Sequence, residues 1–305
     1  MGKRVLVGYG IDVDAVSGWY RQIMHHNDGS APDLTDVSRG IFGATVGIDR
    51  LLKLFDKNNI KASWFVPGHT VESFPEQIQK IKEANHEIGL HGYSHEHVNV
   101  LSDQQERDVL ARSIEVLTKL TGNHPKGWTA PSWKTSPRTI KLLEEFGIEY
   151  DHSFMHHDSQ LYYLPHCHAE ITTTNISQPA ASWMLPMGKL TPSKIVEVPA
   201  NWHLDDWPPF QLEDGPSHGY VDPYVIEQLW KDQFDFLYQE YDTFVFPISL
   251  HPQVSGKPQI MLLHQRLINY LNAHEGVEWC TFGEMVDEFK AGRIGGAQVA
   301  GGVRS

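Results

Sequence analysis

Short apolar runs alternate with segments of helical periodicity along nearly the whole of this 305-residue chain. Buried strands are expected at residues 5–9, 62–66, 87–90, 127–129, 148–150, 244–250 and 277–280. Helices are expected between them, at residues 44–58, 75–85, 102–122, 137–146, 224–240 and 258–273. About seven strands, each followed by a helix, predict an α/β fold in which parallel strands form a closed barrel with helices outside.

Local signals define the ends of one of these helices. Ser102 followed three residues later by Gln105 is a capping box, and Gly122 is a natural C-terminal stop. The buried stripe between them is formed by Val109, Ile114, Leu117 and Leu120.

The alternation predicts one catalytic domain over residues 1–291. A polar loop is expected at residues 27–39. Residues 151–222 break the alternation and are rich in Pro, His and Trp. Such a long irregular segment in a compact domain is usually functional, so we expect it to form one side of the substrate site. The Gly-rich residues 292–305 are expected to form a flexible tail.

Composition and charge exclude several classes of partner. The formal net charge is −13, so we expect no face that binds nucleic acid or anionic lipid. No apolar run approaches the length of a membrane span.

The two cysteines, Cys167 and Cys280, cannot form a disulfide framework and indicate a reducing compartment or indifference to redox state. The strand pattern begins at the N-terminus without room for a cleavable signal, so cytoplasmic residence is expected, with export by another route left open.

A group of carboxylates and imidazoles follows the predicted strands. Asp12 and Asp14 end the first strand, and His91 ends another and precedes His95 by four positions. That spacing places both imidazoles on one side of a helical turn. A catalytic transition-metal site uses three protein ligands and an open position, so Asp14, His91 and His95 are the predicted ligands. Asp12 is the predicted base, and His97 is an alternative to His95.

His251 directly follows the predicted strand 244–250 and is the predicted general acid, because an imidazole near neutral pKa can protonate a leaving amine. Each of these residues also has an ordinary explanation. The carboxylates could cap backbone amides, and the histidines could be solvated or buried structural groups. Chemistry in such barrels sits at the carboxyl ends of strands, where all of them fall, and this coincidence favours a site.

The order of these motifs resembles the polysaccharide deacetylase family, also called the NodB homology family or carbohydrate esterase family four, over residues 4–290. Within the family, the chain is most similar to the branch of the Helicobacter-type peptidoglycan deacetylase and the allantoinase-like and cyclic-imide-hydrolase-like proteins. The matching stretches are Gly10-Ile-Asp-Val-Asp14, Phe65-Val-Pro-Gly68, Glu87-Ile-Gly-Leu-His91-Gly-Tyr-Ser-His95 and His251-Pro252.

The resemblance implies a distorted (β/α)7 barrel, in agreement with the strand pattern. It implies the same roles as the spacing: Asp12 as base, His251 as acid, and Asp14, His91 and His95 as ligands. The implied metal is zinc, although cobalt or nickel suits the same nitrogen and oxygen ligands. Several members form tetramers, so the resemblance also admits a homo-oligomer.

The chain departs from the family pattern at two places. Val13 separates two aspartates that are adjacent in secreted members. The third motif normally opens with Arg, but here it opens with Thr129. We expect substrate contacts from this motif and from the later segment that includes the Asp205-Asp206 pair. The expected contact residues are Thr129, Pro131, Trp133, Trp202 and Asp206, with core packing as the alternative role of the tryptophans.

These observations predict a metal-dependent hydrolase that removes N-acetyl groups from amino sugars, as in chitin oligomers or peptidoglycan. The missing Arg and the irregular segment 151–222 favour an alternative, a hydrolase of small amides or cyclic imides. A third hypothesis is a catalytically silent sugar- or metal-binding protein, which the presence of both Asp12 and His251 disfavours.

Overall fold

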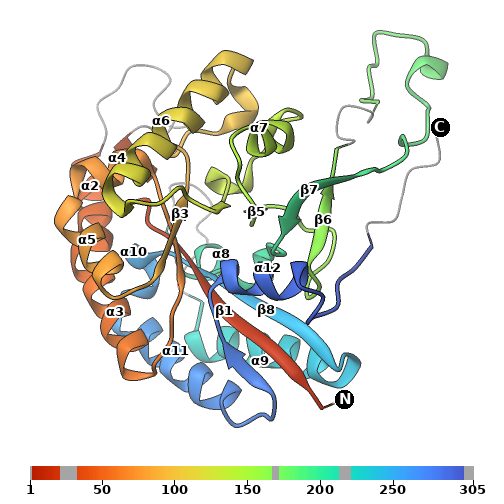
Figure 1. The fold of residues 1–305 in the computed structure, drawn as a ribbon. Helices are drawn as coiled ribbons and strands as arrows, with labels where there is room; N and C mark the ends of the chain where they lie inside the picture. The colour runs from red at the N-terminus through yellow and green to blue at the C-terminus, as the bar shows by residue number, and fades with distance from the viewer. Residues whose placement is uncertain (1, 21–32, 167–171, 213–220, 299–305) are drawn as a thin grey trace.

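The computed structural model describes residues 2–20, 33–166, 172–212 and 221–298. All strands of this part belong to a single sheet (Figure 1). They are β1 (Arg4–Asp12), β2 (Ser63–Val66), β3 (Glu87–Leu90), β4 (Gly127–Trp128), β5 (Tyr150–Asp151), β6 (Tyr162–Pro165), β7 (Pro192–Glu197), β8 (Thr243–Leu250) and β9 (Val277–Trp279). Their order is β6-β7-β5-β4-β3-β2-β1-β8, with β9 beside β1.

The sheet is curled, and most helices lie around its outer side (Figure 1). The helices are α1 (Ser17–Tyr20), α2 (Leu34–Phe42), α3 (Ile48–Lys57), α4 (Gly68–Ser73), α5 (Pro75–Glu83), α6 (Asp103–Thr121), α7 (Thr139–Glu145), α8 (Trp207–Phe210), α9 (Pro223–Glu240), α10 (Pro252–Ser255), α11 (Pro258–Leu271) and α12 (Phe282–Lys290). A π-helix, η1 (Gly43–Gly47), joins α2 to α3. The predicted α/β fold with parallel strands and outer helices is confirmed.

The barrel is less regular than a closed ring of parallel strands. Within the described residues, β6 and β8 are the two ends of the strand order. The pair β6–β7 is antiparallel, because a hairpin replaces one strand–helix repeat. Isolated backbone contacts link the hairpin side to β8, including a hydrogen bond from Val245 N to Ser159 O at 2.9 Å. The sheet is therefore a curled half-barrel.

Two segments expected to be irregular contain regular structure. The loop prediction for residues 27–39 is wrong from Leu34 on, where α2 begins behind an Asp33 cap that accepts from Thr35 N at 2.7 Å; residues 27–32 lie outside the described part. This helix contacts the barrel through Gly40, where an added Cβ would lie 2.4 Å from Ala15 O. Leu34, Val37 and Ile41 do have helical spacing, so the loop prediction gave too much weight to the polar residues around them. The segment 151–222 likewise contains β6 and β7.

The predicted helix 102–122 is confirmed in its ends, but of the predicted buried stripe only Leu117 is fully buried, and Leu110 and Val116 are buried beside it. Ser102 and Gln105 form a reciprocal capping box, with Ser102 N donating to Gln105 Oε1 at 2.9 Å. Gly122 ends the helix in the left-handed region at φ 81°. This helix, α6, contacts β3, the strand that ends at the first predicted histidine.

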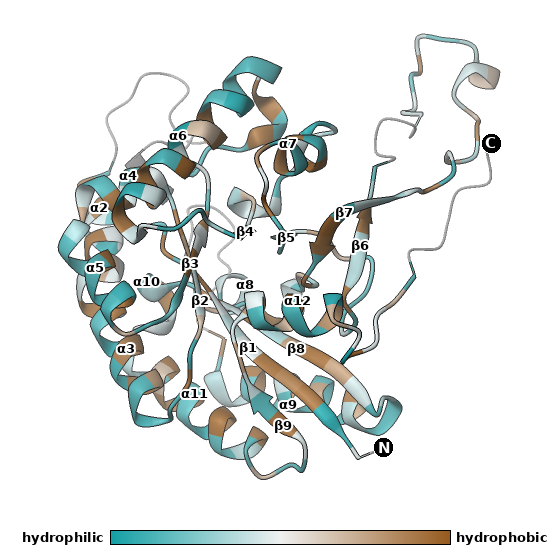
Figure 2. Ribbon diagram, in the orientation of Figure 1, coloured by the Kyte–Doolittle hydropathy of each residue, from teal (hydrophilic) through white to brown (hydrophobic). Residues whose placement is uncertain are grey.

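The helix α12 packs on the inner face of the curled sheet, where apolar residues of the strands lie (Figure 2). The side chains of Phe282 and Met285 are buried there with Leu6 and Phe65. Glycines in β1 allow this approach, since a Cβ at Gly10 would lie 2.6 Å from the Phe282 ring. The sequence pattern missed α12, which follows the last predicted strand.

Replacing Phe282 with alanine is expected to destabilise the fold by about 3–5 kcal/mol, because the ring is fully buried and Gly10 offers nothing to fill the cavity. Urea denaturation followed by circular dichroism measures the change. A matched Phe236→Ala variant, at a ring that is 65 % exposed on α9, should change stability by less than about 0.5 kcal/mol. Equal effects of the two substitutions would contradict the packing described for α12.

The segment expected to form a flexible tail is tied down at its start. Ile294 is buried, and Ala297 N donates to Leu161 O at 2.9 Å. Residues 299–305 lie outside the described part of the chain.

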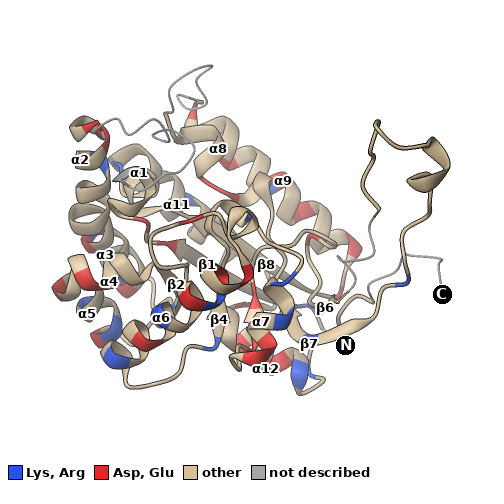
Figure 3. Cartoon of the chain, turned by 90° about the horizontal axis from the view of Figure 1, so that it is seen from above, with Lys and Arg blue, Asp and Glu red and all other residues tan. Residues whose placement is uncertain are grey.

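Lys and Arg are interspersed with Asp and Glu on the outer helices (Figure 3). None of the helices described here is both long enough and apolar enough to cross a membrane.

Candidate metal centre and acid–base pair

The predicted site residues meet at the carboxyl edge of the sheet. Asp12 is the last residue of β1, His91 directly follows β3, and His251 directly follows β8. Because these strands run parallel, their carboxyl ends lie at one edge, and the loops that follow converge there. The exposed fraction of each of these three residues is 8 % or less.

Asp14, His91 and His95 form a compact group of potential metal ligands. Asp14 Oδ1 lies 3.3 Å from His91 Nε2 and 3.6 Å from His95 Nε2. One ligand atom from each residue lies within 4.8 Å of the others, and all three residues are buried. Within the described residues, Asp14 Oδ1 and His91 Nε2 are buried without a hydrogen-bond partner. Two imidazoles and one carboxylate with unpaired atoms fit a divalent transition metal.

The tautomer of His91 suits this function. Its Nδ1 donates a hydrogen bond to the backbone oxygen of Thr129 at 2.8 Å. A carbonyl only accepts, so Nδ1 carries a proton, and Nε2 is the nitrogen that faces Asp14 and is left to bind a metal. Burial lowers the pKa of His95 to about 4, which keeps that imidazole in its neutral form.

A tight turn, rather than the predicted helical turn, brings the two histidines together. Gly92 and His95 both adopt left-handed backbone conformations, with φ of 67° and 59°. The buried Glu96 carboxylate accepts hydrogen bonds from Tyr93 N at 2.8 Å and from Ser94 N at 2.6 Å. A spacing of four residues was therefore the right signal, but the helical conformation inferred from it is wrong. The strained φ at His95 is held by this network.

The predicted alternative ligand lies outside the group. His97 Nε2 is 3.1 Å from Ser132 Oγ in the turn after β4, and His97 is not part of the potential metal group. That neighbouring turn is itself strained, since Ser132 and Trp133 have φ of 53° and 49°. Strained residues of this kind commonly cluster at functional sites.

Asp12 lies close both to His91 of the potential ligand group and to His251. Asp12 Oδ2 is 3.8 Å from His91 Nε2 and 3.9 Å from His251 Nε2. Burial raises the pKa of the Asp12 carboxyl, while the two histidines partly offset this shift. Burial would raise the pKa of Asp14 as well, but its histidine neighbours outweigh burial and hold that pKa below its usual range.

A buried chain of hydrogen bonds orients His251. Its Nδ1 donates to Asp206 Oδ1 at 2.7 Å, and its backbone N also donates to this carboxylate. Ser255 Oγ donates to Asp206 Oδ2 at 2.5 Å and lies 2.9 Å from His264 Nε2. Burial would lower the pKa of His251, but the carboxylates of Asp206 and Asp205 outweigh it and hold that pKa well above its usual range. His251 is thereby suited to donate a proton from Nε2.

Three of the five residues expected to contact substrate are buried, and two of these three hold a histidine of the site in place. Thr129 and Asp206 are fully buried, and they hold histidines of the site: the carbonyl of Thr129 accepts from His91, and the carboxylate of Asp206 accepts from His251. Pro131 is buried against the turn that carries Gly92. Trp202 is 43 % exposed, and its ring packs edge-on against Trp133 at a centroid distance of 4.3 Å. Of the five predicted contacts, this pair of tryptophans is best placed to meet a ligand.

A second group, Asp205, Asp206 and His251, also has ligand atoms within 4.8 Å of one another. Its atoms are already engaged, however. Asp206 accepts from His251 and Ser255, and Asp205 Oδ1 accepts from Trp207 N at 2.6 Å. The Asp14 group, which has unpaired atoms, is the better candidate for a metal.

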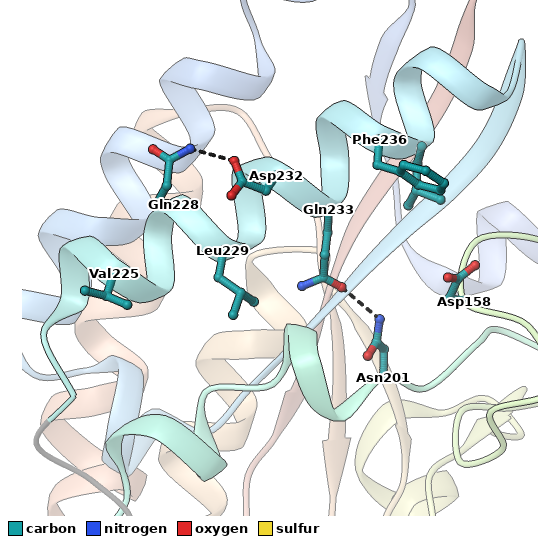
Figure 4. A pocket seen from close by; sticks show the side chains of 9 residues that line it. Asp158, Asn201, Val225, Gln228, Leu229, Asp232, Gln233 and Phe236 are labelled. Carbon is teal, nitrogen blue, oxygen red and sulfur yellow. Dashed lines mark hydrogen bonds between the residues drawn. The ribbon is translucent and has the colours of Figure 1, made fainter.

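The groove along α9 is separate from these residues (Figure 4). Its amides pair with neighbours: Gln233 with Asn201 at 3.2 Å and Gln228 with Asp232 at 2.7 Å. The groove contains none of the predicted catalytic or ligand residues.

The carboxyl edge of the curled sheet carries a potential metal group, a carboxylate and a histidine. This combination on a barrel-like fold is typical of a hydrolase. The chain belongs to the polysaccharide deacetylase family, whose model matches residues 42–150. It is 45 % identical over 291 residues to the peptidoglycan deacetylase of Helicobacter pylori, covering 95 % of this chain and 97 % of that protein. It is 38 % identical to the peptidoglycan deacetylase-like protein FGM2 of Gibberella zeae, covering 94 % and 87 % of the two chains.

Solved structures agree with this assignment. A Mycobacterium smegmatis structure described as a polysaccharide deacetylase superposes with a TM-score of 0.78 at 28 % identity, covering 98 % of this chain and 95 % of that one. The Puue allantoinase superposes with a TM-score of 0.74 at 25 % identity, covering 95 % and 91 %. The protein is a hydrolase that acts on carbon–nitrogen bonds other than peptide bonds, in a family whose deacetylases depend on a metal.

Proposed function

We propose that this protein removes N-acetyl groups from amino sugars of the peptidoglycan or chitin type, using a divalent metal held by Asp14, His91 and His95. The observation that carries the proposal is the placement of a buried carboxylate, Asp12, and an oriented imidazole, His251, beside the unpaired ligand atoms. The similarity to the peptidoglycan deacetylase of Helicobacter pylori supports a peptidoglycan-type substrate. Zinc is the proposed metal, with cobalt or nickel as substitutes for the same ligand set.

The reaction is a hydrolysis of an amide. A metal in this position supplies a Lewis acid for the acyl oxygen and lowers the pKa of water. Asp12 accepts the proton of the attacking water as the new carbon–oxygen bond forms. His251, protonated at Nε2 and held through Nδ1 by Asp206, donates its proton to the nitrogen as the carbon–nitrogen bond breaks. The products are acetate and a free amine.

Acetate release from N-acetylglucosamine oligomers of increasing length tests this proposal. The protein would be freed of metal by a chelator, then assayed with and without added zinc or cobalt. Metal-dependent release of acetate is the expected result. If the metal-loaded protein releases no acetate from any oligomer, the amino-sugar assignment is wrong.

A second candidate is the hydrolysis of small amides or cyclic imides. Two observations favour it: Thr129 occupies the place of the family Arg, and the candidate acid and base are each at least nine-tenths buried. The same oligomer series separates the two candidates. Rates that rise with oligomer length support the sugar assignment, whereas hydrolysis of a cyclic imide without any oligomer cleavage supports the small-molecule assignment.

Replacing Trp202 with alanine is expected to raise KM for N-acetylglucosamine oligomers about 10-fold, because one ring stacked on a sugar contributes roughly 1–2 kcal/mol. The value of kcat should stay within about 2-fold, since Trp202 lies outside the group of potential ligands. Initial rates over a range of substrate concentrations provide both constants. An unchanged KM with a lowered kcat would place Trp202 among residues that act in the chemical step.

We also propose that the protein resides in the cytoplasm and forms a homo-oligomer. The oligomer is supported by exposed apolar residues in the segment 172–191, which projects from the barrel (Figure 1). Ile176 is 94 % exposed and Met184 is 63 % exposed. Sedimentation analysis of the purified protein tests the oligomer, and cell fractionation tests the location.

A further inference from the structure

Asp14 presents its two carboxylate oxygens to different neighbours. Oδ1 faces the imidazoles of His91 and His95 and has no hydrogen-bond partner in the described part of the chain. Oδ2 accepts a hydrogen bond from Gln253 Nε2 at 3.1 Å. The exposed fractions of Asp14 and Gln253 are 1 % and 4 %, so water competes little for this contact.

The position of Gln253 is fixed by close backbone packing. It lies in α10, two residues after His251, and α10 packs against the π-helix η1. A Cβ added at Gly43 would lie 2.9 Å from Gln253 Cβ and 3.0 Å from its Oε1. A Cβ at Gly47 would lie 2.3 Å from Pro252 O. The two glycines of the π-helix therefore let α10 approach and place the amide of Gln253 against Asp14.

We propose that Gln253 is a positioning residue that restricts Asp14 to binding the metal through Oδ1 alone. This inference rests on the metal site proposed above. A carboxylate whose second oxygen accepts a buried amide hydrogen bond is favoured as a one-oxygen ligand, because the amide fixes the orientation of the carboxylate and competes with the metal for that oxygen. Gln253 thus preserves an open position for water and substrate at the metal, as a catalytic site requires.

The test compares Co²⁺ binding by the wild-type chain and two Gln253 variants. Gln253→Met removes the amide at nearly constant size, and Gln253→Asn keeps an amide but withdraws it from Asp14. Both are expected to bind Co²⁺ about 10- to 100-fold more weakly, the usual range for loss of a hydrogen-bond partner of a ligand. Their visible Co²⁺ absorption should be weaker, as expected when a freed carboxylate adds a second oxygen to the coordination sphere.

A matched control is Gln160→Met. Gln160 Nε2 donates to Thr243 O at 2.9 Å, at the opposite end of β8 from His251, and the variant should retain wild-type Co²⁺ affinity. Thermal unfolding without metal shows that each variant is folded. Wild-type Co²⁺ affinity and spectrum in both Gln253 variants would overturn the role of Gln253. Co²⁺ binding that is unaffected by His91→Ala would instead overturn the proposed metal site itself.

Discussion

The Asp14→Ala variant is expected to lose its bound metal and to retain less than about a thousandth of the wild-type rate of acetate release. Metal catalysis of this kind stabilises the transition state by several kcal/mol, and each 1.36 kcal/mol corresponds to a tenfold change in rate. The substitution removes the only carboxylate of the Asp14, His91 and His95 group. Metal content by atomic emission and the initial rate of acetate release measure the two effects.

Asp49→Ala is a suitable control for this variant. Asp49 lies on α3, pairs with Lys80 at 2.8 Å and is substantially exposed, so its removal should leave metal content and rate unchanged. A full complement of metal in Asp14→Ala would contradict the proposed ligand set. Loss of metal with a preserved rate would contradict the proposed mechanism.

The Asp206→Asn variant is expected to lower kcat by roughly 10²- to 10⁴-fold, the usual contribution of a positioned general acid. Asparagine can place an amide N–H against His251 Nδ1, Ser255 Oγ or the backbone N of His251, each of which donates to Asp206 in the native site. The imidazole then loses its orienting acceptor and changes tautomer or position. Metal content should be unchanged, because Asp206 lies outside the proposed ligand set.

This variant should also change the pH dependence of kcat. The carboxylates of Asp206 and Asp205 raise the pKa of His251, and the acid must be protonated to act. Removing the charge of Asp206 lowers the pKa of His251, so activity should be lost at lower pH on the alkaline side of the profile. An unchanged alkaline limb would show that His251 is not the group that titrates there.

The sequence predicted correctly which residues meet when their positions depend on the direction of the strands. Asp12 ends a strand, His91 and His251 each directly follow one, and parallel strands present those ends at one edge of the sheet. Their meeting could therefore be predicted before their distances were known. The capping box at Ser102 could also be predicted, because it depends on residues only three positions apart.

Residues that act through tertiary packing could not be predicted in the same way. Ser255 and His264 support Asp206 only because α10 and α11 bring them together. A weak signal did exist, since His264 interrupts the apolar stripe of α11 formed by Leu263 and Leu267. Gln253 gave no signal beyond its closeness to His251. Its contact with Asp14 joins residues 239 positions apart.

Departures from regular geometry explain the remaining errors. The helix α2 packs through Gly40, while Leu34 and Ile41 of its apolar stripe stay exposed among polar residues, and the segment was therefore taken for a loop. The turn between His91 and His95 uses left-handed conformations at Gly92 and His95, which a residue spacing does not reveal. The antiparallel pair β6–β7, which departs from a closed ring of parallel strands, lies within a segment expected to be irregular.

A crystal of the zinc-loaded protein, measured at the zinc absorption edge, tests the central claim most directly. The account predicts one anomalous-difference peak per chain, about 2.0–2.2 Å from Asp14 Oδ1, His91 Nε2 and His95 Nε2. The second possible group, formed by Asp205, Asp206 and His251, should carry no peak, since its atoms are engaged with one another and with Ser255 and Trp207. A peak there, with none beside Asp14, would contradict the proposed metal site and the roles assigned to Asp12 and His251.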